Sequence, residues 1–578
     1  MSMQPAAWPE PDPLIAAAIK GVYGSRKTPR PLAVQIRDRL GQWLADEDFA
    51  AAFGVRGRPG WSPSRLALVV VLQRAEKLTD RGAAEAVRTR IDWKYLLGLP
   101  VDDPGFDDSV LSEFRTKVAE AGLEQVVLDR LLARLADDGL IKADGKQRTD
   151  STHVVAEVAA LNRLELAGES VRAAVEALAV AHPDWLAQRI CVSDWTARYG
   201  TPLTAWRPPR SKARQEELAL AYARDGYALV EAVYEPSAPA WLRELPAIDV
   251  LRRVLLQNYT RTTTGGREVI KRRQKEPEGD GLPPGHTRIA SPYDTDARWG
   301  VKRDTFWLGY KLHVSETCDD PPACACPGER HERDCQAPTF PNLITHVATT
   351  QATVPDSQMT QAIDDALAGK GLTPARHYLD SGYLSAALVV AEAARHGIAL
   401  IGPLLADTSA QARAGVGYAR ANFTINYGGQ SVTCPQGATS ASWTPCTQRG
   451  KDAIVVQFAT ATCGPCPAKA LCTKGKHRTL TVPPRDLAQA QAAARAEEKT
   501  IPFQADYARR AAVEGTMHQA ASHGARRARY RGLPKTRLDH VYMAAALNLL
   551  RLHAYWTGTP LDRRRTSHLA RLELTLAA

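Results

Sequence analysis

The stretch that most constrains the fold is ARHYLDSGYLSAALVVAEAARHGIALIGPL, residues 375–404. It is typical of a strand, a tight turn, a helix from about Ser385 to His396, and a second strand, with Gly397 ending the helix. A strand–helix–strand unit of this kind implies parallel strands joined by a right-handed crossover. Asp380 falls at the carboxyl end of the first strand, where open α/β sheets place their ligands and catalytic groups.

The segments on either side fit an α/β core. FWLGYKLHVSE (306–316) and LITHVATTQAT (343–353) are typical of strands, and DSQMTQAIDDALAGKG (356–371) is typical of a helix. Asp150 lies in another β-prone stretch, LIKADGKQRTDSTHVVAEV. Residues 265–286 are basic and then rich in Pro and Gly, which predicts a loop.

The first 138 residues are predicted to be helical. Ser62 and Thr79 are candidate N-caps, and Gly122 is a helix stop. Because Arg56, Arg58, Arg65 and Arg74 lie here, the region can hold a helix-turn-helix, and a plain helical bundle fits equally well.

Bulk properties narrow the class of protein. A chain of 578 residues is too long for one core, and 74 Lys and Arg against 63 Asp and Glu give a formal charge of +11, which favours a polyanionic partner. No signal-peptide pattern and no run of about 18 apolar residues occurs, so we expect no membrane span.

One acid stands in the otherwise apolar and basic run YARRAAVEGTMHQAASHG, which begins at Tyr507. Tyr507, Arg510 and Glu514 are spaced i, i+3 and i+7, which predicts one shared helix face. Taken alone, this pattern is typical of an exposed Arg510–Glu514 ion pair.

Three acids therefore stand out: Asp150, Asp380 and Glu514. Singly, each is typical of a turn, a cap or a surface pair. Together they fit phosphoryl transfer, in which close carboxylates hold two divalent cations roughly 3.5–4 Å apart. Carboxylate ligands suit Mg²⁺ or Mn²⁺.

The chain resembles the DDE transposases of bacterial insertion sequences, in particular the eleven-eighty-two group. RTDSTHVVAEVAALNRLELAGE around Asp150, HYLDSGYLSAALV around Asp380, and the Tyr-x2-Arg-x3-Glu pattern of Tyr507, Arg510 and Glu514 carry the resemblance. DARWGVKRDTFWLGYKLH also looks like the second strand of that family. The family pattern has a Lys seven residues after the Glu, and here that position is Ala521.

The resemblance implies an RNase H-like catalytic core, a mixed sheet flanked by helices, with Asp150, Asp380 and Glu514 as metal ligands. Tyr507 and Arg510 would then contact phosphates of the transposon end. The implied organisation is an N-terminal helical DNA-binding domain, a core in three parts, a mainly helical insertion and a β-rich insertion. In chain order, the boundaries are 1–138, 139–160 (core), 161–290 (helical insertion), 291–405 (core), 406–500 (β-rich insertion) and 501–578 (core, Glu helix and basic tail).

A basic segment follows the Glu helix and is predicted to contact DNA. It holds no acid, and its cations are Arg526, Arg527, Arg529, Arg531, Lys535 and Arg537. Tyr530 lies within it and can stack or contact a phosphate.

Two groups of cysteines are present. Cys434, Cys463, Cys466 and Cys472 lie in the 406–500 segment with knuckle-like spacing, which predicts a structural zinc site, the alternative being buried thiols. Cys446 is the spare thiol of that segment. The second group is typical of an enlarged polar loop, with metal binding as the other interpretation; it comprises Cys318, Cys324, Cys326 and Cys335.

The leading hypothesis is a cytoplasmic, nucleoid-associated transposase. It would bind terminal inverted repeats of double-stranded DNA as a homodimer, cleave the ends and join their 3′-hydroxyls to target DNA. Two rivals stay open: a catalytically inactive or domesticated DNA-binding protein, and an RNase H-like nuclease that cuts without joining.

Overall fold

The computed structural model describes most of the chain. The residues outside the description are 1–4, 6–7, 25–28, 55, 58–59, 203–208, 210, 266, 275–280, 303, 321–339, 408, 449 and 559–578. Arg58, Cys324, Cys326, Cys335 and the predicted enlarged loop around those cysteines lie outside the described residues.

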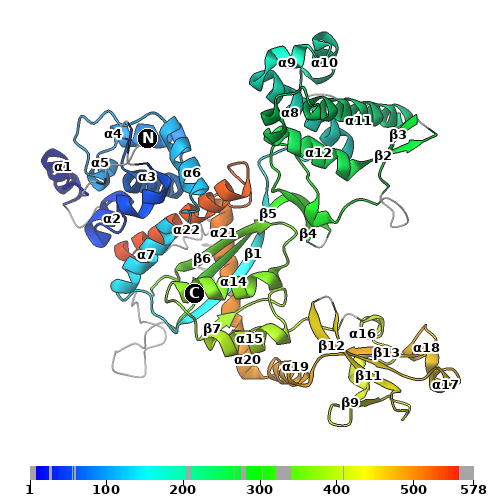
Figure 1. Cartoon of the computed structure of the whole chain (residues 1–578). Coiled ribbons are helices and arrows are strands. Elements are labelled where there is room, and N and C mark those ends of the chain that lie inside the picture. The colour runs from blue at the N-terminus through cyan, green and yellow to red at the C-terminus, as the bar shows by residue number, and fades with distance from the viewer. Residues whose placement is uncertain are drawn as a thin grey trace, which may run out of the picture.

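A mixed sheet forms the centre of the molecule (Figure 1). Strand β5 pairs antiparallel with β1, β4 and β6, while β7 pairs parallel with β1 and with β8. The predicted α/β core with a mixed sheet is therefore confirmed. The strands are β1 (Lys146–Val155), β4 (Arg298–Lys302), β5 (Thr305–Thr317), β6 (Ile344–Gln351), β7 (Arg376–Tyr378) and β8 (Ala399–Ile401).

The predicted strand–helix–strand unit is present as β7, α15 and β8. Helix α15 (Ala386–His396) begins at Ser385, whose hydroxyl accepts from the Leu388 N–H, and ends at Gly397 in the left-handed conformation (φ 70°). Both expected boundaries follow from ordinary capping chemistry.

Helices cover both faces of the sheet. Side chains alternate along a strand, so Arg148 and Asp150 of β1 share one face, and Thr149 and Ser151 share the other. The first face packs against α21 (Val513–Ser522) and α22 (Leu533–Thr557); the second packs against α14 (Met359–Gly369).

Seven helices and a 3₁₀ turn make up the described N-terminal region, with the predicted N-caps at Ser62 and Thr79. All of them except the first helix share one apolar core with the sheet and with α22, in which every residue from Leu538 to Leu549 is buried. The first helix packs through Ile15 and Ile19 in a small separate cluster with Val34. The elements are α1 (Pro13–Tyr23), α2 (Leu32–Leu40), η1 (Asp46–Ala52), α3 (Pro63–Glu76), α4 (Asp80–Thr89), α5 (Ile91–Leu97), α6 (Ser109–Glu120) and α7 (Val126–Asp137).

A lobe between β1 and β4 extends away from the sheet (Figure 1). It is mainly helical and has its own apolar core. Its elements are α8 (Arg163–Ala181), α9 (Pro183–Ala187), α10 (Val192–Tyr199), α11 (Lys212–Tyr234), η3 (Ala240–Glu244), α12 (Pro246–Asn258), β2 (Tyr259–Thr264), β3 (Arg267–Arg272) and η4 (Gly285–Thr287).

The loop predicted from Gly265 onward is wrong in its first part. Residues 267–272 form β3, which pairs antiparallel with β2 across a turn at Gly265 (φ 59°). The segment was predicted as a loop because it is rich in basic residues. A short exposed hairpin can form there nevertheless, because strand pairing tolerates charged side chains on solvent-facing strands.

A second lobe separates β8 from α20 and is built on small sheets (Figure 1). Its elements are α16 (Ala410–Ala414), η6 (Arg420–Asn422), β9 (Thr424–Asn426), β10 (Ser431–Thr433), β11 (Ser442–Gln448), β12 (Lys451–Gln457), α17 (Thr460–Cys463), α18 (Lys469–Cys472), β13 (Thr479–Val482) and α19 (Arg485–Glu497). Among the helices that the structure describes, none is long and apolar enough to cross a membrane.

Candidate active site

Asp150, within β1, and Asp380, just after β7, both lie beyond the carboxyl end of the parallel pairing between these two strands. The β1–β7 pairing ends at Arg148 opposite Tyr378, two residues before each aspartate. Beyond that point neither strand has the other as a partner, so both carboxylates are available at the open edge. Local backbone groups orient them: Asp150 Oδ1 accepts from the Ser151 N–H (2.7 Å), and Asp380 Oδ1 accepts from the Gly382 N–H (2.8 Å).

One guanidinium brings the two carboxylates together. Arg510 Nη2 lies 3.0 Å from Asp150 Oδ2 and 3.8 Å from Asp380 Oδ2. The Arg510 and Asp150 side chains are 15% and 14% exposed, and that of Asp380 is 33% exposed. The sequence alone allowed an ion pair between Arg510 and Glu514. Among the described residues, Arg510 pairs instead with Asp150 and Asp380.

Burial dominates the electrostatics of the Asp150 carboxyl. Burial raises the pKa of the Asp150 carboxyl above its ordinary value, Arg510 opposes that rise, and the nearby Asp380 adds to it. Burial also raises the pKa of the Tyr507 phenol, with Arg510 opposing and Asp380 and Asp150 reinforcing the rise. Arg510 therefore contacts both aspartates, and the charges of the aspartates act on Tyr507.

The expectation of one continuous helix from Tyr507 to Glu514 is wrong. Helix α20 (Ile501–Tyr507) ends at Tyr507, a 3₁₀ segment η7 (Ala508–Ala512) carries Arg510, and α21 starts at Val513. A 3₁₀ segment has about three residues per turn instead of 3.6. This tighter winding rotates Glu514 away from the line of Tyr507 and Arg510.

Glu514 stands in the first turn of α21 with its side chain exposed. Within the described part of the chain, no hydrogen bond or ion pair joins it to another residue. Among the described residues, moreover, no group of three or more His, Cys, Asp or Glu side chains is placed to hold a metal ion. The structure thus brings Asp150 and Asp380 together and leaves Glu514 outside the pair.

A further acid near the site escaped the sequence reasoning. Asp356 Oδ1 pairs with Lys311 Nζ (3.0 Å), and Asp356 Oδ2 accepts from the Ser151 hydroxyl (3.3 Å). A Cβ placed on Gly382 would lie 3.0 Å from Asp380 Oδ1 and 3.4 Å from Asp356 Oδ2, so both carboxylates border this glycine. In the sequence VPDSQMT, Asp356 stands at the start of a predicted helix, where an aspartate is common. The sequence therefore contained no reason to assign Asp356 to a site.

Tyr383 supports the same corner of the sheet from within. Its side chain is fully buried, and its hydroxyl lies 2.6 Å from His313 Nδ1. Burial raises the pKa of Tyr383, and Asp356, Asp150 and Asp380 all act in the same direction. Three aspartates therefore surround this phenol.

The predicted DNA-contact segment is partly engaged with the protein. Arg526, Arg527, Arg531 and Arg537 are exposed. Arg531 pairs with Glu157, and half-buried Arg529 pairs with Asp80. Tyr530 lies against the guanidinium groups of Arg115 and Arg529, so its ring faces protein cations. In the N-terminal region, Arg74 is buried and pairs with Asp539.

Four of the five cysteines in the second lobe, Cys434, Cys463, Cys466 and Cys472, line one cavity of about 270 Å³. Cys434 and Cys466 both start tight turns, because their carbonyls accept from the Gly437 and Lys469 N–H groups. Cys446 lies outside this cavity, on β11 opposite Ala453 of β12. All of these residues are free thiols, as is buried Cys318 beside the sheet.

Comparison with known families identifies transposase domains at both ends of the chain. Residues 25–117 match a transposase domain (DUF772). Residues 433–553, which include Glu514 and the four cysteines of the cavity, match a transposase DDE domain. Neither a curated protein nor a solved structure matches the chain.

The chain therefore carries two regions that match transposase domains, and a DDE domain is characteristic of metal-dependent polynucleotidyl transferases. A DDE domain also suggests an RNase H-like interpretation of the mixed sheet. The family uses divalent cations, and the carboxylate oxygens of Asp150 and Asp380 are donors that such cations prefer.

Proposed function

We propose that this protein is the transposase of a bacterial insertion sequence of the eleven-eighty-two group. It binds the terminal inverted repeats of its element, cleaves the ends and joins their 3′-hydroxyls to target DNA. The observation that carries the proposal is the meeting of Asp150 and Asp380, 230 positions apart in the chain, at the nitrogen of Arg510. A transposase DDE domain in the same chain supports it.

Asp150, Asp380 and Glu514 are the residues that would hold two Mg²⁺ or Mn²⁺ ions, which requires the exposed Glu514 side chain to turn toward the aspartate pair. When bound, such ions activate the attacking oxygen and stabilise the leaving oxygen of a phosphoryl transfer. In the structure Arg510 neutralises the aspartates. Its Nε is buried and forms no hydrogen bond with a described residue, so the protein leaves one donor of this guanidinium unused.

Arg510 and Tyr507 would engage the end of the transposon. Arg510 contacts the aspartate pair, and the charges of Asp380 and Asp150 act on the Tyr507 phenol. The exposed cations Arg526, Arg527 and Arg531 follow on the chain and would contact the flanking duplex. Synapsis of two ends would use a homodimer, with the DNA of the nucleoid as target.

Strand transfer with labelled transposon ends tests the catalytic proposal. Asp150→Asn, Asp380→Asn and Glu514→Gln each keep size and remove a ligand charge, so each should abolish cleavage and joining with end binding nearly intact. Asp365→Asn, at an exposed site on α14 that pairs with Arg395, is the control and should stay active. Retained strand transfer in Glu514→Gln would end the proposal.

The same assay separates the rivals. Wild-type protein that cleaves without joining is a nuclease, and wild-type protein that binds ends without either reaction is a DNA-binding protein. Inverted repeats close to both ends of the reading frame would support the transposase directly.

We also propose that Cys434, Cys463, Cys466 and Cys472 hold a structural zinc ion. They come from three parts of the second lobe and line one cavity, beside a small apolar core built around Phe423 and Phe458. Small cores of this kind gain much of their stability from a metal. Rotation of the thiols into the cavity would be needed, since no three of the described cysteines are at coordination spacing.

Elemental analysis of the purified protein tests the zinc proposal. We expect about one zinc per chain, its loss in the double variant Cys463→Ser/Cys466→Ser, and its retention in the matched variant Cys446→Ser. Zinc that persists in the double variant, or its absence from the wild type, would refute the site.

A further inference from the structure

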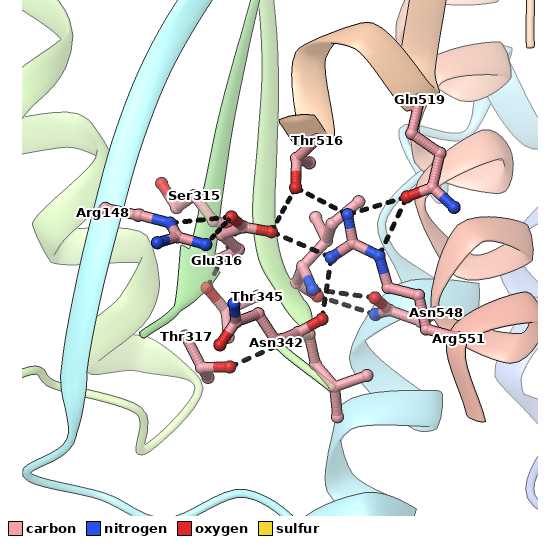
Figure 2. Close-up of polar contacts among 12 residues, drawn as sticks. Arg148, Ser315, Glu316, Thr317, Asn342, Thr345, Thr516, Gln519, Asn548 and Arg551 are labelled. Atoms are coloured by element: carbon pink, nitrogen blue, oxygen red, sulfur yellow. Dashed lines mark hydrogen bonds and ion pairs between the residues drawn. The ribbon is translucent and has the colours of Figure 1, made fainter. Parts of the chain in front are cut away.

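A completely buried carboxylate connects the elements of the candidate active site (Figure 2). Glu316 on β5 is 0% exposed and lies between Arg148 on β1 and Arg551 on α22, which are 5% and 6% exposed. Arg148 Nη2 is 2.7 Å from Glu316 Oε1, and Arg551 Nη1 is 2.8 Å from Oε2. Burying charges is costly unless each one is paired and hydrogen-bonded, so this arrangement tolerates little rearrangement.

Helix α21 is fastened to that carboxylate by a side-chain hydroxyl. The Thr516 hydroxyl donates to Glu316 Oε2 (2.6 Å) and accepts from Arg551 Nη2 (2.6 Å). Gln519, one turn later, accepts from Arg551 at 2.9 Å and 3.0 Å (Figure 2). Both attachments are close to Glu514, and Thr516 is only two residues away.

Strand β1 and segment η7 join the same group of residues. Arg148 precedes Asp150 by two residues and lies on the same face of the strand. Its Nη1 donates to the carbonyl of Arg509 (2.6 Å), the residue immediately before Arg510. One buried cluster, defined as Arg148, Glu316, Thr516 and Arg551, therefore contacts the elements that carry Asp150, Arg510 and Glu514.

We propose that the buried cluster is a positioning device that fixes the register of η7 and α21 against β1. This inference rests on the proposed function. Apolar residues of similar volume can stabilise a fold as well as a buried ion pair does, but their contacts allow sliding. Directional hydrogen bonds to Thr516 and to the Arg509 carbonyl determine instead where Glu514 and Arg510 stand relative to Asp150. Misplacement by about 1 Å can cost about 100-fold in rate.

Thr516→Val tests the device without disturbing the buried ion pairs. It keeps the side-chain volume and removes the hydroxyl that connects α21 to Glu316. We expect end cleavage to slow by about 10- to 100-fold with the affinity for transposon ends nearly unchanged. The melting temperature should fall to a similar extent in Thr516→Val and in the control below, because each loses a buried hydroxyl that is hydrogen-bonded. Thr516→Ser retains the hydroxyl and should restore most of the rate.

Thr345→Val is the matched control. Thr345 on β6 is equally buried, and its hydroxyl donates to Gln147 Oε1 (2.5 Å) without contacting α21. This variant should cleave at close to the wild-type rate. Wild-type cleavage by Thr516→Val, or failure of Thr516→Ser to restore the rate, would overturn the inference. A larger loss of melting temperature than in Thr345→Val, together with weaker end binding, would show a structural role only and would also overturn it.

Mn²⁺ affinity supplies a measurement that does not depend on turnover. If the cluster positions Glu514, Thr516→Val should weaken Mn²⁺ binding in the same direction as Glu514→Gln, while Thr345→Val should not. Unchanged Mn²⁺ affinity in Thr516→Val would refute the positioning role. A wild-type protein that binds Mn²⁺ but does not cleave would count against the proposed function and leave this comparison valid.

Discussion

Arg510 is an ion-pair partner of Asp150, with 3.0 Å between the guanidinium nitrogen and the carboxylate oxygen. The same nitrogen reaches Asp380, so one cation offsets the repulsion of two carboxylates. In the proposed function, divalent cations take over this neutralisation and release Arg510 toward DNA.

Arg510→Ala should separate metal binding from DNA engagement. Mn²⁺ should still bind, and at least as tightly, because the competing guanidinium is gone. Affinity for a transposon end should fall by about tenfold, the effect of losing a charge-assisted hydrogen bond of about 1.4 kcal/mol. Arg509→Ala removes a neighbouring cation that pairs with Asp320 and Asp506, and it should change neither quantity much. Loss of Mn²⁺ binding in Arg510→Ala would contradict this account.

Asp356→Asn should slow catalysis without unfolding the protein. It weakens the ion pair with Lys311 and the contact with Ser151, the residue after Asp150. A shift of Ser151 would displace Asp150, so we expect a rate loss of about tenfold or more in end cleavage. Asp365→Asn, on the exposed side of α14, should leave the rate unchanged. Equal rates for the two variants would show that Asp356 has no part in the site.

The exposed arginines after α21 should govern the salt dependence of DNA binding. Each phosphate contact removed should lower the slope of log affinity against log salt by about 0.9 on duplex DNA. We expect this for Arg527→Ala and Arg531→Ala, and no change for Arg395→Ala, which is exposed and pairs with Asp365. If the salt slopes of Arg527→Ala and Arg531→Ala equal that of the wild type, these two arginines are not part of the DNA-contact surface.

Buried histidines should make the protein sensitive to acid. Burial lowers the pKa of His313 and of His540 to about 4, from about 6.5 in an unfolded chain. Between these values the unfolded state binds more protons than the folded state, so stability falls as the pH falls. Each residue contributes roughly 1.4 kcal/mol per pH unit within that range.

Melting temperatures recorded from pH 7 to pH 4 provide the measurement. His313→Gln should flatten the dependence, and His286→Gln, at an exposed site in η4, should leave it unchanged. If the melting temperature of His313→Gln falls more steeply with decreasing pH than that of the wild type, protonation of His313 does not destabilise the folded state.

Local signals explain why part of the fold is predictable from the sequence. Ser385 and Gly397 define both ends of α15, and the strands around that helix have the expected apolar runs. Asp150 and Asp380 could be singled out because the first lies within a β-prone stretch and the second follows one. A short 3₁₀ segment within a helix, by contrast, has no distinct apolar pattern. The break at η7 that reorients Glu514 could therefore not be predicted from the sequence.

The remaining features depend on contacts between distant segments. Glu316 becomes a buried charge only because strand pairing and α22 place Arg148 and Arg551 beside it. Nothing near Glu316 in the sequence indicates either partner, which are 168 and 235 positions away. Asp356 was likewise hidden, since its role arises from Lys311 and Ser151.

Helix α22 has a consequence for how the chain acquires its structure during synthesis. The N-terminal helices pack around Tyr542 and Leu549, which belong to the last described helix of the chain. A ribosome therefore releases the first seven helices long before their central packing partner exists. The apolar surface of those helices stays exposed until α22 is synthesised. A nascent chain truncated before residue 533 would therefore remain dependent on chaperones.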